Sequence, residues 1–175
     1  MLIVVALAVE RLVPPLTGAV RVADGDSLVV AGERVRLDGI DAPELHQSCG
    51  EAGREWPCGA RAKAALEAIV AEGEVSCRPV DEDRYGRAVA VCELSAKEGG
   101  AKEGGANERG AKEGAAKDRA ARDLGARQVA AGWALATDGA YAREEAQARA
   151  AGKGIWSGPF DMPAEWRARH PRPPE

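Results

Sequence analysis

The sequence has few histidines, no excess of positive charge and no long apolar run. Its 175 residues include two histidines, so catalysis that depends on histidine has little material to work with. The formal net charge of −4 disfavours strong electrostatic binding of nucleic acid, which usually depends on basic patches. The apolar run at residues 2–9 is too short to cross a bilayer as a helix. These absences leave one domain of ordinary globular composition, with 45% apolar and 30% charged residues.

The N-terminal residues 1–17 are predicted to form a segment of their own. Residues 2–9 fit the apolar core of a secretory signal, and Ala6-Leu7-Ala8 resembles a small-x-small cleavage site. No basic residue precedes the run, so a strand is the alternative. We favour export, which predicts a secreted or periplasmic protein without stable membrane association after processing. The main domain is expected over residues 18–160, followed by a tail over 161–175 that packs across it.

The most informative stretch runs from Asp24 to Glu44 and contains two acidic turns. Between the turns, an apolar run and an alternating run predict a β-hairpin that turns near Gly32. A hairpin brings its outer ends together, so Asp26 and Asp41 are expected to be neighbours. Neighbouring carboxylates repel each other unless a cation lies between them, and carboxylate and carbonyl oxygens suit Ca²⁺ or Mg²⁺. The alternative is that Asp, Gly and Pro are present here only as turn formers.

The register of this hairpin decides whether Arg36 can join the acidic pair. With a two-residue turn, side-chain alternation places Asp26 and Arg36 on opposite faces of the hairpin. A three-residue turn or a bulge at residues 31–33, or an irregular strand end, would place them on one face. A site that includes both residues therefore requires one of these irregularities.

A second stretch, Asp83-Arg84-Tyr85-Gly86-Arg87, lies between two β-like runs, residues 74–80 and 88–94. If the chain turns at this pentad, two arginines and a tyrosine stand at the tip of a hairpin. Guanidinium groups bind phosphate oxygens in fork geometry, and a tyrosine ring can stack on a base. Arg84 and Tyr85 are therefore predicted to bind substrate. Together with the acidic pair, this tip is typical of a site that cleaves phosphodiesters with the help of a metal ion.

The four cysteines are predicted to form two disulfides, Cys49–Cys58 and Cys77–Cys92. A turn at residues 83–86 places Cys77 directly opposite Cys92, where the two side chains can be bridged. The gap between Cys49 and Cys58 is too wide for a zinc knuckle. Disulfides favour an oxidising compartment, and buried free thiols in a cytosolic protein are the alternative.

Three helices and an insert are predicted in the rest of the chain. Apolar residues at helical spacing indicate a helix over 59–72, and weaker patterns indicate helices near 119–131 and 141–151. Residues 96–118 repeat every five residues, with balanced charge and many glycines. Such a sequence opposes a stable helix and has no large apolar residue to bury, so it predicts a flexible inserted loop. Trp156 is expected in the core.

Three blocks of sequence resemble the staphylococcal nuclease (thermonuclease) family. They are Asp24-Gly-Asp-Ser, Arg36-Leu-Asp-Gly-Ile-Asp-Ala-Pro-Glu44 and Asp83-Arg-Tyr-Gly-Arg87, in that order. The resemblance covers roughly residues 20–156 and implies a mainly β fold with helices (α+β), a five-stranded OB-type β-barrel with three helices. It also implies a calcium-dependent endonuclease, a phosphodiesterase that hydrolyses DNA and/or RNA and leaves 3′-phosphates. We expect the protein to be a monomer.

The resemblance also assigns roles to residues at matching positions. Ca²⁺ would be held by Asp26, Asp41 and the carbonyl of Ala42, the scissile phosphate would be contacted by Arg36 and Arg87, and the attacking water would be acted on by Glu44. Ala42 departs from the threonine of the best-known member, but a carbonyl ligand survives that change. No tyrosine after Ala134 clearly matches one that the family uses at the nucleotide, since Tyr141 falls in a predicted helix.

Two other functions stay open. One is a non-catalytic OB-fold module that binds nucleic acid or protein, and the other is an envelope protein that is stabilised by Ca²⁺ and has only a structural role. A pure binding module would not require Asp26, Arg36, Asp41, Glu44 and Arg87 together, so their joint presence argues against it.

Overall fold

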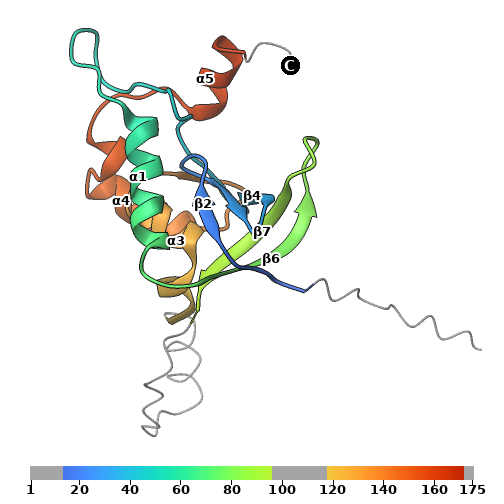
Figure 1. The fold of residues 1–175 in the computed structure, drawn as a ribbon. Helices are drawn as coiled ribbons and strands as arrows, with labels where there is room; N and C mark the ends of the chain where they lie inside the picture. The colour runs from blue at the N-terminus through green and yellow to red at the C-terminus, as the bar shows by residue number, and fades with distance from the viewer. Residues whose placement is uncertain (1–13, 96–117, 172–175) are drawn as a thin grey trace, which may run out of the picture.

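The computed structural model describes residues 14–95 and 118–171, which fold as an α+β domain (Figure 1). A mostly antiparallel sheet lies on one side of the view, and helices α1 (Cys58–Val70), α3 (Leu124–Ala130) and α4 (Ala142–Ala150) gather on the other. The predictions for residues 1–13 and for residues 96–117 of the insert lie outside the described residues, whereas Asp118, the last residue of the predicted insert, is helical. In the part of the chain that is described, no helix is both long and apolar enough to cross a membrane.

The main sheet has six strands in the order β1-β6-β7-β4-β3-β2. Their bounds are β1 Leu16–Thr17, β2 Val20–Val22, β3 Ser27–Val30, β4 Glu33–Leu37, β6 Val75–Glu82 and β7 Ala88–Leu94. All neighbours pair antiparallel except β4 and β7, which are parallel. A separate pair joins β5 (Ile40–Asp41) to β8 (Leu135–Ala136). Among the described strands this order does not close into a ring, so the five-stranded barrel stays a prediction.

The β3–β4 hairpin has a two-residue turn, and the bulge suggested for this turn is wrong. Ser27 pairs with Arg36, which leaves Ala31 and Gly32 to make the turn with φ of 50° and 92°. This left-handed pair matches the twist of a tight hairpin. The structure has the irregular strand end instead, because β3 begins only at Ser27. Asp26 therefore lies beyond the regular strand, where side-chain alternation does not fix its direction.

The β6–β7 hairpin confirms the second predicted turn. It places Cys77 opposite Cys92, and both predicted disulfides, Cys49–Cys58 and Cys77–Cys92, are present. None of the four cysteines is free. The tip of the hairpin projects beyond the body of the sheet (Figure 1).

The helices follow the predicted order with one break. α1 and α4 agree with the helices predicted at 59–72 and 141–151. The helix predicted at 119–131 is interrupted at Asp123, whose backbone is extended and whose carboxylate accepts a hydrogen bond from the Ala126 amide. Asp123 thus caps α3, a preference of aspartate that competes with continuation of the helix.

The tail, predicted only to pack across the domain, forms a helix of its own. A short 3₁₀ turn, η1 (Gly154–Ser157), precedes helix α5 (Pro163–Arg169). Proline suits the first position of a helix, because an amide hydrogen there would have no hydrogen-bond partner within the helix and proline has none. Figure 1 shows α5 apart from the other helices, at the same end of the view as the β6–β7 tip.

Two apolar clusters hold these elements together. The larger one joins buried residues of the main sheet to those of α1 and α3. The smaller one gathers the Cys49–Cys58 disulfide and Ile155 with Trp56, Trp133, Trp156 and Phe160. Trp156 is half-buried and packs edge-on against Phe160, which agrees with its predicted place in the core.

Candidate active site

Asp26 lies in a tight turn between β2 and β3 that the helices hold in place. Its amide donates to Oδ1 of Asp24 (3.1 Å), and a Cβ added to Gly25 would come within 2.8 Å of the Ala62 methyl in α1. Gln128 of α3 is fully buried and donates to the carbonyls of Gly25 (3.0 Å) and Ala62 (2.7 Å). Glycine is required at position 25 because the turn is pressed against α1.

The carboxylate of Asp26 is buried and makes three polar contacts. It accepts hydrogen bonds from the Ser27 hydroxyl (2.8 Å) and the Ala42 amide (3.1 Å), and it pairs with Arg36 at 3.3 Å. Burial raises the pKa of Asp26 to about 7, and Asp24 adds to this, against the lowering effects of its three partners. A buried carboxylate of this kind is stabilised by additional positive charge.

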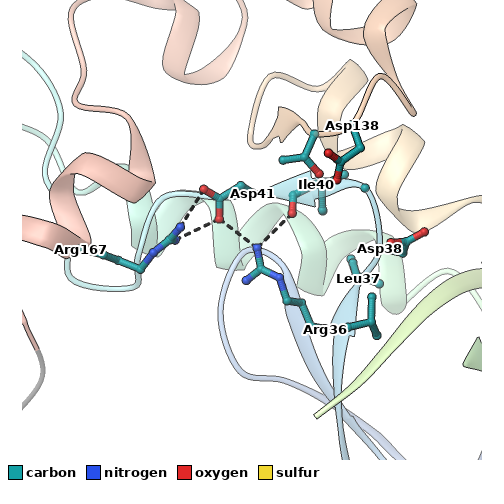
Figure 2. A pocket seen from close by; sticks show the side chains of 10 residues that line it. Arg36, Leu37, Asp38, Ile40, Asp41, Asp138 and Arg167 are labelled. Carbon is teal, nitrogen blue, oxygen red and sulfur yellow. Dashed lines mark hydrogen bonds and ion pairs between the residues drawn. The ribbon is translucent and has the colours of Figure 1, made fainter. Parts of the chain in front are cut away.

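Arg36 joins the two predicted metal-binding carboxylates, and Figure 2 shows its contact with Asp41. One terminal nitrogen lies 3.3 Å from Asp26, and the other donates to Asp41 (3.0 Å) and to the Ile40 carbonyl (3.2 Å). Burial alone lowers the pKa of Arg36, but the two carboxylates outweigh burial and the net shift is upward. Asp26 and Asp41 thus share one guanidinium group.

Asp41 is also bound by Arg167 of α5, a residue that sequence reasoning missed. The two terminal nitrogens of Arg167 donate to the two carboxylate oxygens of Asp41, each at 3.0 Å. The same group donates to Glu44 at 3.1 Å. Hydrogen bonding to Asp41 is the largest cause of a raised pKa for Arg167. The only signal in the sequence is the basic character of the tail, which does not single out one arginine.

Glu44 opens a loop that is fixed at several points. Its amide donates to the side chain of Gln47 (3.2 Å), and the Cys49–Cys58 disulfide ties the loop to the start of α1. Gly59 of α1 packs so closely on the Glu44 carbonyl that any side chain there would collide with it. The position of Glu44 beside Asp41 is therefore set by the loop and its disulfide.

The β6–β7 tip brings a third arginine to the edge of this cluster. Arg87 pairs with Asp83 of its own turn (2.7 Å) and donates to the Ser27 hydroxyl at 3.4 Å. Ser27 in turn donates to Asp26, so Arg87 is one side chain removed from the acidic pair.

Arg84 and Tyr85 lie further out on the same tip. The Tyr85 side chain is exposed, and the Arg84 guanidinium lies 4.8 Å from the centre of its ring. The two predicted substrate-binding residues thus stand outside the acidic cluster, where a long substrate could meet them.

The predicted metal ligands form an all-oxygen set. Within residues 14–95 and 118–171, no three histidine, cysteine or acidic side chains are grouped so that they could hold a metal ion. The predicted set consists of two carboxylates, Asp26 and Asp41, and the Ala42 carbonyl. Hard oxygen donors suit Ca²⁺ better than a transition metal, and the raised pKa of Asp26 marks a place where added positive charge is favourable. These residues fit Ca²⁺ in their chemistry.

A pocket of about 350 Å³ opens beside Asp41. Arg36 and Arg167 contribute to its lining, and Asp38 and Asp138 face it from the opposite side (Figure 2). An anionic group that entered this pocket would meet two guanidinium groups.

A small α+β domain that gathers carboxylates and arginines at one end has the side chains of a phosphodiester-cleaving protein. The model of the staphylococcal nuclease homologue family matches residues 34–158, and the chain belongs to this family. Proteins of the family are usually nucleases and are generally metal-dependent. The resemblance predicted from the three sequence blocks is confirmed.

Two curated proteins are similar over part of the chain. Succinoglycan biosynthesis protein ExoI of Rhizobium meliloti (strain 1021) is 42% identical over 80 residues, which are 45% of this chain and 42% of that protein. Protein ParB of Escherichia coli is 40% identical over 74 residues, which are 40% of this chain and 37% of that protein. The chain thus spans less than half the length of these curated relatives.

Proposed function

We propose that this protein is a calcium-dependent endonuclease, a phosphodiesterase that hydrolyses DNA and/or RNA and leaves 3′-phosphates. The observation that carries the proposal is the guanidinium of Arg36, which binds both Asp26 and Asp41 in a chain of the staphylococcal nuclease family. Glu44 and Arg87 lie at the edges of the same cluster. These are the kinds of group that metal-assisted phosphodiester cleavage requires.

In the proposed site, Ca²⁺ would be held by Asp26, Asp41 and the carbonyl of Ala42. Bound there, the ion would polarise the phosphate and lower the cost of forming hydroxide. The burial of Asp26 supports this role, because Arg36 alone does not bring its pKa down to the ordinary range. A bound cation would also offset the acidic character that disfavours nucleic-acid binding.

The side chains of the site would share the rest of the chemistry. Arg36 and Arg87 would bind the scissile phosphate and stabilise the charge that develops on it. Glu44 would accept a proton from the attacking water. Arg84 and Tyr85 would bind the neighbouring nucleotides, since an exposed ring can stack on a base.

The finer features of fold and location belong to the same proposal. The edge strands β1 and β2 are separated only by Gly18 and Ala19, which supports a five-stranded OB-type barrel if they are two halves of one bent strand. The two disulfides support a secreted or periplasmic location. We further propose a monomer whose nuclease domain spans residues 18–160.

The test is to incubate the purified full-length protein with end-labelled DNA and RNA, in Ca²⁺ or in excess chelator. We expect cleavage only in Ca²⁺, and end-group analysis should find 3′-phosphates. Undiminished cleavage in the chelator would contradict the metal dependence. Binding of oligonucleotides without any cleavage would favour a non-catalytic OB-fold module.

A further inference from the structure

Arg167 contacts the predicted site residues Asp41 and Glu44 but lies outside the three sequence blocks. It covers Asp41 and Glu44 from the solvent side, because its own side chain is 39% exposed while theirs are 11% and 18% exposed. In Figure 2 it approaches Asp41 from the side opposite to the Ile40 carbonyl that Arg36 contacts. Its position makes it the outermost cation of the site.

Helix α5 is docked on the loop that carries Glu44. The side chain of Gln47 donates to the Asp161 carbonyl (2.7 Å), and Pro163, the first residue of α5, is buried. These contacts do not involve Arg167. The helix can therefore stay in place while the Arg167 side chain moves.

We propose that Arg167 competes with Ca²⁺ for Asp41 and thereby sets the calcium affinity of the site. This inference rests on the proposed function, in which Asp41 is a calcium ligand. Oδ1 of Asp41 accepts hydrogen bonds from Arg36 and Arg167, and Oδ2 accepts one from Arg167. A cation that takes either oxygen must weaken the bidentate pair, so Ca²⁺ and Arg167 cannot both bind Asp41 at full strength.

The charges of the cluster indicate which arginine gives way. Without a metal ion, Arg36 and Arg167 both bind Asp41, so one carboxylate faces two guanidinium groups. A divalent cation at Asp41 would add to this positive charge and leave one guanidinium in surplus. The Arg167 side chain is 39% exposed and that of Arg36 is 24% exposed, so Arg167 regains water more readily when its pair breaks.

The test is to measure Ca²⁺ binding by isothermal titration calorimetry, without nucleic acid, for full-length wild type, Arg167→Ala and Arg169→Ala. Arg169 is a matched control on the same helix, because it carries the same charge but pairs with Asp161 (2.7 Å). We expect Arg167→Ala to bind Ca²⁺ roughly ten-fold more tightly than wild type, which is about 1.4 kcal/mol. Arg169→Ala should match wild type. Arg167→Lys should fall between, since lysine keeps the charge but lacks the fork.

The sign of the change separates competition from a structural role. An arginine that only supports the site would weaken Ca²⁺ binding when lost, or leave it unchanged, and either result overturns the inference while the proposed function survives. If Arg169→Ala gained as much Ca²⁺ affinity as Arg167→Ala, the cause would be the loss of a positive charge anywhere on α5. That result would also overturn the inference. If circular dichroism shows that Arg167→Ala does not fold, Arg167→Lys is used in its place. Tighter Ca²⁺ binding than wild type supports the inference, and weaker or equal binding overturns it. If neither wild type nor the Arg167 variants bind Ca²⁺, the metal dependence of the proposed function fails and the inference fails with it.

Discussion

The two arginine-bearing regions beside the acidic cluster, the β6–β7 tip and α5, differ in what holds their arginines. At the tip, the shortest contact of Arg87 is with Asp83, four residues away in the same turn, and a longer one reaches the Ser27 hydroxyl. On α5, Arg167 pairs with Asp41, which lies 126 residues away in the chain. The contact of Arg87 with Asp83 can form locally, whereas the Arg167 contact exists only when the whole domain has folded.

This difference indicates two different roles. An arginine that is fixed by its own turn keeps its place when a metal ion or substrate arrives, which suits the binding of a phosphate group. An arginine that is held by candidate metal ligands must respond when those ligands bind an ion. Arg87 is therefore assigned to the substrate and Arg167 to control of the metal site.

The largest effect is expected for Glu44, which Arg167 of α5 contacts. Glu44→Gln keeps the shape of the side chain but removes a proton acceptor, so turnover should fall by roughly 10²–10⁴. Calcium affinity should be affected less than in Asp26→Ala, because Glu44 is assigned to water. Single-turnover hydrolysis and calorimetry measure the two quantities, and near-normal turnover in folded Glu44→Gln would remove Glu44 from the mechanism.

A slightly smaller effect is expected at the tip. Arg87→Ala should lower turnover by roughly 10²–10³, because it removes charge stabilisation at the phosphate. Its unfolding free energy should change by less than about 1 kcal/mol, because the lost pair lies within one turn at the end of a hairpin. Arg84→Ala is the matched control on the same tip, and we expect it to raise KM more than it lowers kcat. Equal kinetic defects in both variants would contradict the separate role of Arg87.

The disulfides allow each region to be loosened separately. Loss of Cys77–Cys92 or of Cys49–Cys58, by paired Cys→Ser substitution, should lower the free energy of unfolding by about 2–3 kcal/mol in each case in the chain-entropy model. Of the two disulfides, only Cys49–Cys58 ties down the Glu44 loop on which α5 is docked. At temperatures where both variants are folded, loss of Cys49–Cys58 should therefore reduce activity more. Urea titration and turnover at one temperature make this comparison, and the reverse order of activities would contradict it.

The last effect concerns the pH dependence of stability, and it is small for each pH unit. Burial raises the pKa of Asp26 from 3.8 to about 7 in the folded protein, so this group favours folding at low pH and loses that contribution as pH rises through 7. With chelator present, the free energy of unfolding of wild type should therefore fall more steeply between about pH 4 and pH 7 than that of Asp26→Asn. The difference between the two slopes should be at most about 1.4 kcal/mol per pH unit. Urea titrations across this range provide the measurement. Parallel stability curves for the two proteins would show that Asp26 does not titrate there.

The parts of the site that the sequence predicted are those set by short-range geometry. The tip around Arg87 and the pairing of Cys77 with Cys92 follow from strand alternation and turn chemistry over a few residues. The shared contact of Asp26 and Asp41 with Arg36 was harder to predict, because alternation across a two-residue turn argued against it. The turn at Gly25, pressed against α1 and bound by Gln128, supplies the missing irregularity through tertiary contacts.

Two features that the sequence did not predict have different causes. The break at Asp123 reflects a local capping preference that overrides a weak helical pattern. Arg167 could not be identified because its partner is chosen by the docking of α5 on the loop after Glu44. The residues next to Arg167 in the sequence do not distinguish it from the other arginines of the basic tail.

The most direct test of the proposed active site is the rate at which wild type and Asp41→Asn hydrolyse labelled DNA and RNA at a Ca²⁺ concentration that saturates wild type. Asparagine keeps the size of the side chain but removes the charge that Arg36, Arg167 and the metal ion would share. We predict that wild type cleaves and that Asp41→Asn is slower by at least roughly 10²-fold, comparable to the loss of a charge-stabilising group in other sites. Equal rates for the two folded proteins would contradict the assignment of the catalytic centre to this cluster.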